Sequence, residues 1–458
     1  MKPTACCARL SLISAGALPL LLCACSSSSG APGGLAAVKP VGCAADRPAI
    51  ALQGGQPIAP QPTGAPVPCI TTTGYASVDP TLVVTEGGKV LFAPANVPGF
   101  TSSTDQGQTW AKPASPPMAP GGMLYHPWLW HDQVAHRLFY NVFSISQSTC
   151  ADGSGATLWT SDDEGASWIH APVGCGSQDW GKVITGPAAT AASKAALAQS
   201  KYPDMVYYCA TGPQAIIGPD HICYRSTDGG KTFVETATHP VSGSDGYPPA
   251  GAVGPDGTVY VPKGSAMGLD IATSKDEGDT WTDDIVTGST FVGTSSRNWL
   301  SLNVTADSAG NIYAAWSDDK DLLPYLAVTK DQGATWSVPV SVAAPGVLTS
   351  AYPSITVGTP GYVAIAYYGS TTARGSTDGY FSSDGLAYGA YLTVTKNLFD
   401  AVPVFWSAQL NDPAIPAFTG LSFDVSEYAG YPVFSPDGTI WTSFLGDKKG
   451  FAARLVFP

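Results

Sequence analysis

The sequence predicts an all-β protein built from repeated units. One eight-residue motif, Ser/Thr-x-Asp-x-Gly-x-Thr/Ser-Trp/Phe, occurs five times, at residues 103–110, 161–168, 226–233, 274–281 and 329–336. Repeats of about 20 to 50 residues are typical of propellers, solenoids and arrays. The runs between the motifs are rich in β-branched and aromatic residues, as strands are. A helix-like composition is confined to residues 188–200, which we interpret as an insertion.

Each copy of the motif has the chemistry of a tight, self-capped turn. The aspartate can accept hydrogen bonds from nearby backbone amides, and the glycine two residues later supplies a positive φ. The closing aromatic residue begins the next strand. We therefore predict a structural role for the five aspartates: Asp105, Asp163, Asp228, Asp276 and Asp331. A degenerate sixth copy begins at Thr395, with Asn397 in place of the aspartate.

The motif resembles the Asp-box, or BNR repeat, of the sialidase-like β-propeller superfamily. This resemblance implies a propeller fold, in which each box forms the turn between the third and fourth strands of a blade. It also implies that the boxes lie on the rim, away from the ligand-binding face.

A second periodic element gives the expected number of blades. A polar or aromatic residue, often followed by proline, precedes an apolar strand, a glycine turn and an aromatic strand. The seven instances start at or beside Asp79, His126, Trp180, Tyr247, Arg297, Tyr352 and Tyr431. They predict seven four-stranded blades, with six as the alternative because the second instance and the sixth box depart from their patterns. The last instance has chain for about three strands, so ring closure needs a strand from residues 45–76.

The N-terminal residues predict export and a lipid anchor. Lys2 and Arg9 form a short positive start before an apolar run that ends near Cys25, which is similar to a bacterial lipoprotein signal. We expect residues 1–24 to be a signal peptide, Cys25 to carry the lipid, residues 25–42 to form a flexible tether and residues 43–458 to form one propeller domain. The protein is then anchored to the bacterial cell envelope.

The remaining cysteines support an oxidising compartment. An even number of cysteines in an exported protein predicts disulfides. Six remain after Cys25, and we expect three bridges with sequential pairing favoured, among Cys43, Cys69, Cys150, Cys175, Cys209 and Cys223. Six cysteines allow 15 pairings, so the sequence alone leaves the connectivity open.

Charge and motif content exclude several classes of function. The formal net charge is −13, whereas a nucleic-acid-binding protein needs a basic surface. The sequence has no phosphate-binding glycine loop, Gly-x-Ser-x-Gly elbow or His-Glu-x-x-His motif. His126, His131 and His136 are five residues apart, a spacing that alternates faces on a strand. We expect no cofactor, no metal site and a monomer.

The candidate ligand face is the channel mouth at the starts of the inner strands. The predicted binding residues are Asp79, His126, Trp180, Tyr247, Arg297, Tyr352 and Tyr431. Aromatic rings of this kind stack on sugar rings, and polar groups bind the sugar hydroxyls. The sequence therefore favours a surface-tethered module that binds an extracellular ligand, with a glycan as the first choice.

Two alternatives from other classes stay open. The first is a glycoside hydrolase, either sialidase-like, which the resemblance implies would use a Tyr-Glu pair and an Asp, or of another type that uses two carboxylates. The candidate catalytic residues are Asp79, Glu427 and Tyr428. Sialidases of the resembled superfamily hold the substrate carboxylate with three arginines, one of them in an Arg-Ile-Pro motif that this sequence lacks. The second alternative is a non-catalytic scaffold with a protein partner.

Overall fold

The structure is a computed structural model of the chain. It describes residues 42–77, 79–94, 99–112, 114, 124–144, 156–174, 181–211, 220–237, 239–240, 250–265, 268–290, 302–374, 384–420, 430–446 and 448–458. All of these belong to one compact unit, Val41–Pro458. Cys25, most of the predicted tether and the predicted signal peptide lie outside the described residues.

The described strands form seven antiparallel sheets, named here sheets 1 to 7 in chain order of their innermost strands. Sheet 1 contains β4 (Thr81–Val84), β5 (Val90–Ala93) and β6 (Thr101–Ser103). Sheet 2 contains β7 (Leu124–Asp132), β8 (Arg137–Ser144), β9 (Ala156–Ser161) and β10 (Ile169–Gly174). Sheet 3 contains β11 (Lys182–Gly186), β12 (Met205–Thr211), β13 (Asp220–Ser226) and β14 (Val234–Glu235), and β15 (His239–Pro240) also pairs with β13.

The remaining sheets follow the same order of strands. Sheet 4 contains β16 (Ala252–Val253), β17 (Val259–Ser265), β18 (Gly268–Ser274) and β19 (Thr282–Ile285). Sheet 5 contains β20 (Leu302–Ala306), β21 (Ile312–Ser317), β22 (Pro324–Thr329) and β23 (Val340–Ser341). Sheet 6 contains β24 (Thr349–Val357), β25 (Val363–Ser370), β26 (Ala387–Thr395), β27 (Phe405–Gln409), β1 (Ile50–Gln53), β2 (Gln56–Pro57) and β28 (Phe418–Thr419). Sheet 7 contains β29 (Val433–Phe434), β30 (Ile440–Gly446), β31 (Lys449–Val456) and β3 (Val67–Ala76).

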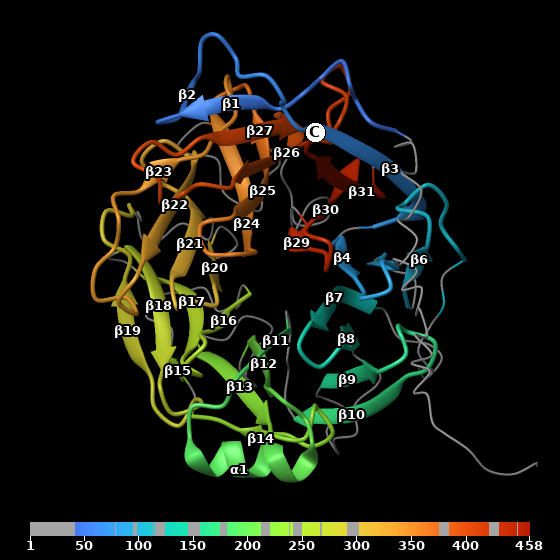
Figure 1. The fold of residues 1–458 in the computed structure, drawn as a ribbon, viewed down its shortest axis with the longest axis vertical. Coiled ribbons are helices and arrows are strands. Elements are labelled where there is room, and N and C mark those ends of the chain that lie inside the picture. The colour runs from blue at the N-terminus through green and yellow to red at the C-terminus, as the bar shows by residue number, and fades with distance from the viewer. Residues whose placement is uncertain are drawn as a thin grey trace, which may run out of the picture. The chain divides into compact units, whose positions relative to one another are not determined.

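The innermost strands make a closed circle, which identifies the fold as a β-propeller. Each one contacts the next in the order β4, β7, β11, β16, β20, β24 and β29, and β29 contacts β4 again (Figure 1). Ring closure is achieved within sheet 7, where β3 pairs antiparallel with β31. The expectation that a strand from residues 45–76 closes the ring is therefore confirmed.

The strand count corrects the prediction of seven four-stranded blades. Among the described residues, six sheets have at least four strands and sheet 1 has three, so six four-stranded blades, the alternative count, is the one supported. Beyond β6, the described residues add one bridge between Phe100 and Ala114 and a bond from the Ala111 amide to the Ser102 carbonyl. Pro113 falls between these contacts and has no N–H to donate.

The five motif turns have one geometry and equivalent positions. Each follows the third strand of its sheet: β6, β9, β13, β18 and β22. In every copy the first hydroxyl donates to the aspartate at 2.7–2.9 Å and accepts the glycine amide at 2.7–2.9 Å. The seventh residue donates its amide at 2.8–2.9 Å and its hydroxyl at 2.6 Å. The expected self-capped turn is confirmed.

The degenerate copy keeps part of this network. It follows β26, the third strand of sheet 6, and Asn397 accepts from the Thr395 hydroxyl at 3.1 Å and from the Val404 amide at 3.0 Å. The amide oxygen thus replaces one carboxylate oxygen, while the second acceptor of the complete turns is lost.

Two disulfides and one helix complete the described fold. Cys43–Cys69 joins the chain before β1 to β3, and Cys209–Cys223 joins directly opposite residues of β12 and β13. These are two of the three sequential pairs; Cys150 and Cys175 lie outside the described residues. The helix α1 (Ala191–Ser200), between β11 and β12, confirms the helix-like insertion and begins at the N-cap Thr190. No helix in the described part of the chain is long and apolar enough to cross a membrane.

Candidate functional site

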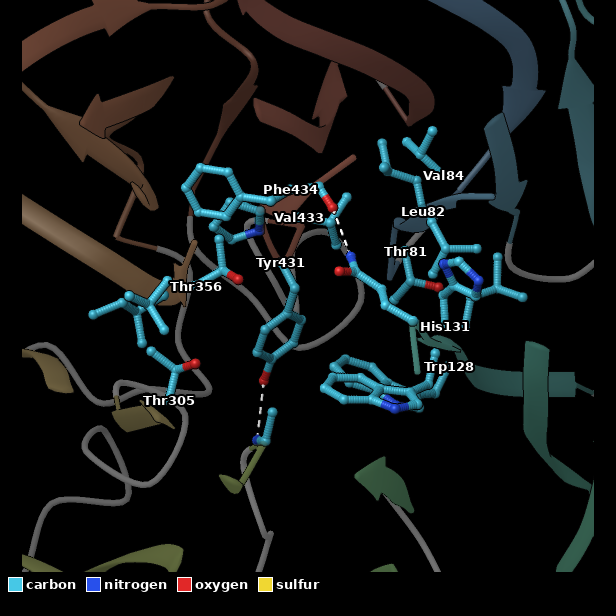
Figure 2. A pocket seen from close by; sticks show the side chains of 18 of the residues that line it. Thr81, Leu82, Val84, Trp128, His131, Thr305, Thr356, Tyr431, Val433 and Phe434 are labelled. Atoms are coloured by element: carbon cyan, nitrogen blue, oxygen red, sulfur yellow. Dashed lines mark hydrogen bonds between the residues drawn. The ribbon is translucent and has the colours of Figure 1, made fainter. Parts of the chain in front are cut away.

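The candidate site is a cavity of about 270 Å³ inside the circle of inner strands (Figure 2). Its walls are side chains of β4, β7, β20 and β24 together with residues 250–251 and 431–434. Thr81, Trp128 and Tyr431 lie toward the starts of the inner strands. Val84, Gln133 and Phe434 lie toward their ends. The cavity therefore follows the axis of the propeller.

Two tryptophans form one wall of the cavity. Trp128 and Trp130 alternate on β7, so both rings lie on the same face of the strand, with centroids 6.4 Å apart and planes inclined by 14°. Their indole N–H groups donate to sheet 3: Trp128 to the Val183 carbonyl at 3.2 Å and Trp130 to the Thr185 hydroxyl at 3.0 Å. These bonds fix both rings against β11, where Trp128 is buried at 2% exposure and Trp130 is half-buried.

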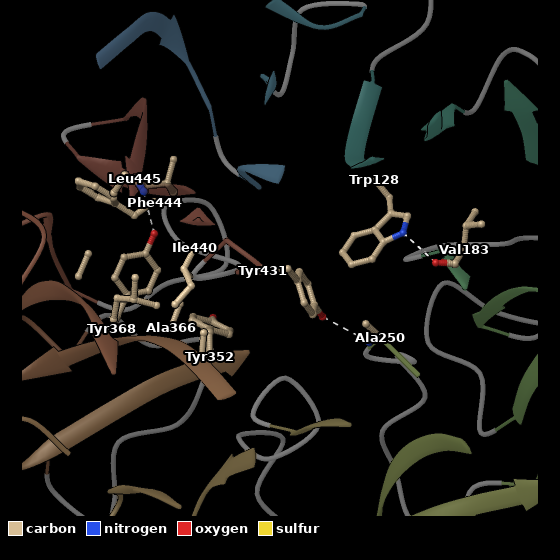
Figure 3. Packing of buried hydrophobic residues seen from close by; sticks show 14 of the residues in the cluster. Trp128, Val183, Ala250, Tyr352, Ala366, Tyr368, Tyr431, Ile440, Phe444 and Leu445 are labelled. Carbon is tan, nitrogen blue, oxygen red and sulfur yellow. Dashed lines mark hydrogen bonds between the residues drawn. The ribbon is translucent and has the colours of Figure 1, made fainter. Parts of the chain in front are cut away.

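Tyr431 faces this wall from sheet 7. Its ring lies 4.5 Å from that of Trp128 at an interplanar angle of 88° (Figure 3). The hydroxyl accepts the Ala250 amide at 3.3 Å, which connects the chain before β29 to the chain before β16 across the circle. Burial raises the pKa of Tyr431, so the hydroxyl is neutral at physiological pH. The Nζ of Lys182 lies 5.0 Å from the Trp128 ring, within the range of a cation–π contact.

The other end of the cavity is more polar. Gln133 donates to the Phe434 carbonyl at 2.9 Å, a contact between sheets 2 and 7 that Figure 2 shows as a dashed line. Thr305, Thr356 and His131 also contribute side chains to the lining. Burial is the largest influence on His131 and lowers the pKa of its imidazole below 6.5. This end therefore offers hydroxyl, amide and neutral imidazole groups.

Three of the predicted binding residues are described in full, and all three are buried. Asp79 is 1% exposed, Tyr352 1% and Tyr431 8%. Tyr431 lines the cavity, whereas Asp79 and Tyr352 do not. The Asp79 charge contributes to raising the pKa values of Tyr368 and Tyr431, after burial as the main cause.

The proline pairs do not all begin strands. Tyr352-Pro353 lies inside β24 at a register shift, and His126-Pro127 lies at the equivalent shift in β7. Proline cannot donate to the ladder, so a β-bulge accommodates it, and Tyr352 there has a φ of 54°. The side chain of His126 lies outside the described residues, as do Trp180, Tyr247, Arg297, Glu427 and Tyr428.

The residues that sequence reasoning missed are those of β7 itself. Trp128, Trp130, His131 and Gln133 all line the cavity. The signal was available, because two tryptophans two residues apart in an extended segment share a face.

The described lining of the cavity contains neither an arginine nor a carboxylate. Most glycosidases use two carboxyl groups about 5 to 9.5 Å apart, and sialidases use a tyrosine as the nucleophile. Two arginines that do not line the cavity contact protein groups: Arg47 donates to the Asn411 carbonyl at 2.8 Å, and Arg374 lies 3.4 Å from Asp384. The described residues therefore supply ring faces and neutral polar groups rather than an acid pair.

Comparisons with known proteins give similarity of fold at low identity. No protein-family model matches the chain, and no curated protein sequence matches it. NanB sialidase from Streptococcus pneumoniae has 12% identity and a TM-score of 0.40, covering 84% of this chain and 69% of its own. Virginiamycin B lyase from Staphylococcus aureus has 12% identity and a TM-score of 0.46, covering 85% and 99%. YCF48 from Cyanidioschyzon merolae has 10% identity and a TM-score of 0.45, covering 84% and 98%. The propeller assignment thus stands on the sheets and their circle of inner strands.

Proposed function

We propose that this protein is a surface-tethered β-propeller binding module that recognises an extracellular glycan at the mouth of its central cavity. The observation that carries the proposal is the Trp128–Trp130 pair faced by Tyr431. Tryptophan faces pack on the C–H surfaces of sugar rings, and a few polar groups then fix the orientation. At about 270 Å³ the cavity suits a chain end or a single sugar ring better than an extended polymer.

The finer assignments of the fold belong to the same proposal. We assign the five motif turns to the Asp-box, or BNR, repeat. The sixth copy, which carries Asn397, follows the third strand of its sheet as the five complete copies do. This position supports a shared repeat.

Location at the cell envelope is the other half of the proposal. The two described disulfides are typical of exported proteins. Cys25 then carries the lipid, and the segment up to residue 42 gives the propeller reach above the membrane. The formal net charge of −13 makes the protein repel nucleic acids and other polyanions. This repulsion favours neutral glycans as ligands.

A glycan array run beside a panel of fluorogenic glycosides tests the function. Trp130→Ala is the variant of choice, because Trp130 lines the cavity but is only partly buried. We expect binding to at least one glycan class without turnover, and a loss of affinity of about 10-fold in the variant, as expected when a stacking contact of about 1.4 kcal/mol is removed. The matched control is Trp336→Ala, a tryptophan of similar exposure in a motif turn.

The outcomes separate the three functions. Equal loss in both tryptophan variants would place binding outside the cavity. Glycoside turnover that Asp79→Asn or Glu427→Gln abolishes would replace the binding module with a hydrolase. Neither binding nor turnover would leave a scaffold with a protein partner.

A further inference from the structure

Three potential metal ligands meet where sheets 1 and 2 adjoin. Glu86, His131 and His136 each place one ligand atom within 4.8 Å of the other two, and Nδ1 of His136 lies 3.2 Å from Oε1 of Glu86. Glu86 is in the turn between β4 and β5. His131 is in β7, and His136 is in the turn between β7 and β8. The cluster therefore draws on two successive sheets.

The hairpin explains why two histidines five residues apart meet. The expectation of alternate faces treats the segment as a single strand, whereas β7 ends at Asp132 and the chain reverses over residues 133–136. Asp132 accepts the Val134 and Ala135 amides at 3.0 Å each, and His136 takes a left-handed φ of 54°. The turn thus returns the second imidazole toward the first.

The turn that carries Glu86 is also held in place. Glu164, from the motif turn of sheet 2, accepts the Gly87 amide at 2.8 Å, and its carbonyl accepts the Lys89 Nζ at 2.8 Å. Both ligand-bearing turns are therefore fixed by bonds that do not use the ligand atoms themselves. Outer contacts of this kind orient metal ligands before the metal arrives.

The hydrogen bonding and the charged neighbours of His131 favour a bound cation. Nδ1 of His131 is buried and makes no hydrogen bond of standard geometry among the described residues, and the backbone of Val84 is a neighbouring polar group that acts on the imidazole. The charged and titratable groups that act on it are Glu86, Asp132, His136 and Glu164. Three of these four are acids.

We propose that Glu86, His131 and His136 bind one zinc ion, or a transition metal ion of similar preference. Two imidazoles and one carboxylate are a known protein ligand set for zinc, whereas calcium and magnesium take oxygen ligands. With bonds of about 2.0–2.2 Å, tetrahedral ligand atoms lie roughly 3.3–3.5 Å apart. The Glu86–His136 pair is already at 3.2 Å.

Binding requires only small side-chain movements. Since all separations are within 4.8 Å, none must close by more than about 1.5 Å, and the side chains of His136 and Glu86 are 62% and 42% exposed. The ion would link sheet 1 to sheet 2 beside the polar end of the central cavity, which His131 also lines. Three protein ligands leave a fourth position for water.

Titration of the chelator-treated, tag-free chain with zinc tests the site. Calorimetry should give one equivalent of Zn²⁺, and Co²⁺ in its place should give the visible absorption bands of a tetrahedral ion. At zinc concentrations about 100-fold above Kd, Tm should rise by about 3 °C. Ca²⁺ and Mg²⁺ should produce neither heat nor a shift in Tm.

Two variants with matched controls decide the assignment. Glu86→Gln and His136→Gln change exposed side chains and should each weaken zinc binding by at least about 100-fold, because removal of a ligand exceeds the loss caused by an outer partner. Glu235→Gln and His170→Gln, exposed residues on β14 and β10, should bind as the unchanged chain does. Absence of a saturable site at micromolar zinc would overturn the proposal, as would unchanged affinity in either ligand variant.

Discussion

Replacing Asp163 with alanine tests the stabilising role of the motif turns. Its carboxylate accepts three bonds: the Ser161 hydroxyl at 2.8 Å, the Ser167 amide at 2.8 Å and the Ser167 hydroxyl at 2.6 Å. The bonds from Ser167 are the main reason that the pKa of Asp163 falls from 3.8 to about 2. Alanine removes every acceptor while leaving the glycine and the strand ends unchanged.

Two independent routes give the magnitude. Three hydrogen bonds at about 0.5–1 kcal/mol each predict a loss of roughly 1.5–3 kcal/mol from the free energy of unfolding. A pKa lowered from 3.8 to about 2 corresponds to about 2.4 kcal/mol, which we reduce to about 1 kcal/mol because the side chain of Asp163 is exposed to solvent. We expect about 1–2 kcal/mol, or a fall in Tm of roughly 2 °C for a domain of this size.

Urea unfolding followed by tryptophan fluorescence measures the loss, and pH gives the sharper test. The folded-state pKa lies below the unfolded one, so the stabilisation is present above pH 3.8 and disappears as the pH falls through about 2. Asp163→Asn keeps the Oδ1 acceptor and should lose about half as much. Asp46→Ala, at an exposed position outside the five motif turns, is the control. The stabilising role of the carboxylate would be refuted if Asp163→Ala lost no more free energy of unfolding than Asp46→Ala. It would also be refuted if the loss in Asp163→Ala were the same at pH 7 and pH 2.

Two further predictions concern the anchor and the interior. Cys25→Ala should move the exported protein from the membrane fraction to the soluble fraction, as shown by fractionation and immunoblotting; a variant that stays with the membrane would refute the lipid anchor. Burial, with the nearby Asp132, raises the pKa of Asp204 to about 6, above its unfolded value of 3.8, so its contribution to stability is lost as the pH rises through 6. Lowering the pH from 7 to 5 should therefore add about 1 kcal/mol to the free energy of unfolding, a gain absent in Asp204→Asn; equal gains in both proteins would contradict this assignment.

The sequence by itself determined the local structure. A motif turn needs a hydroxyl, an acceptor, a positive-φ residue and an aromatic residue at fixed spacing. The bonds at Asp163 join residues that are 2 and 4 positions apart in the chain. Opposed cysteines in one hairpin, such as Cys209 and Cys223, are likewise close in the chain. Ring closure by β3 could be predicted because the last repeat lacks a strand and the chain before the first repeat supplies one.

Only the tertiary structure decided which side chains share the cavity and which meet at the proposed metal site. Asp79 and Tyr352 are buried where the sequence predicted a mouth, and Trp128 and Trp130 form the wall instead. Glu86 meets His131 and His136 only because sheets 1 and 2 are neighbours in the ring. The strand count of sheet 1 depends on the few bonds that Ala111 and Ala114 make beside β6. Contacts between sheets depend on how each blade packs against the next, and no spacing within one repeat records that packing.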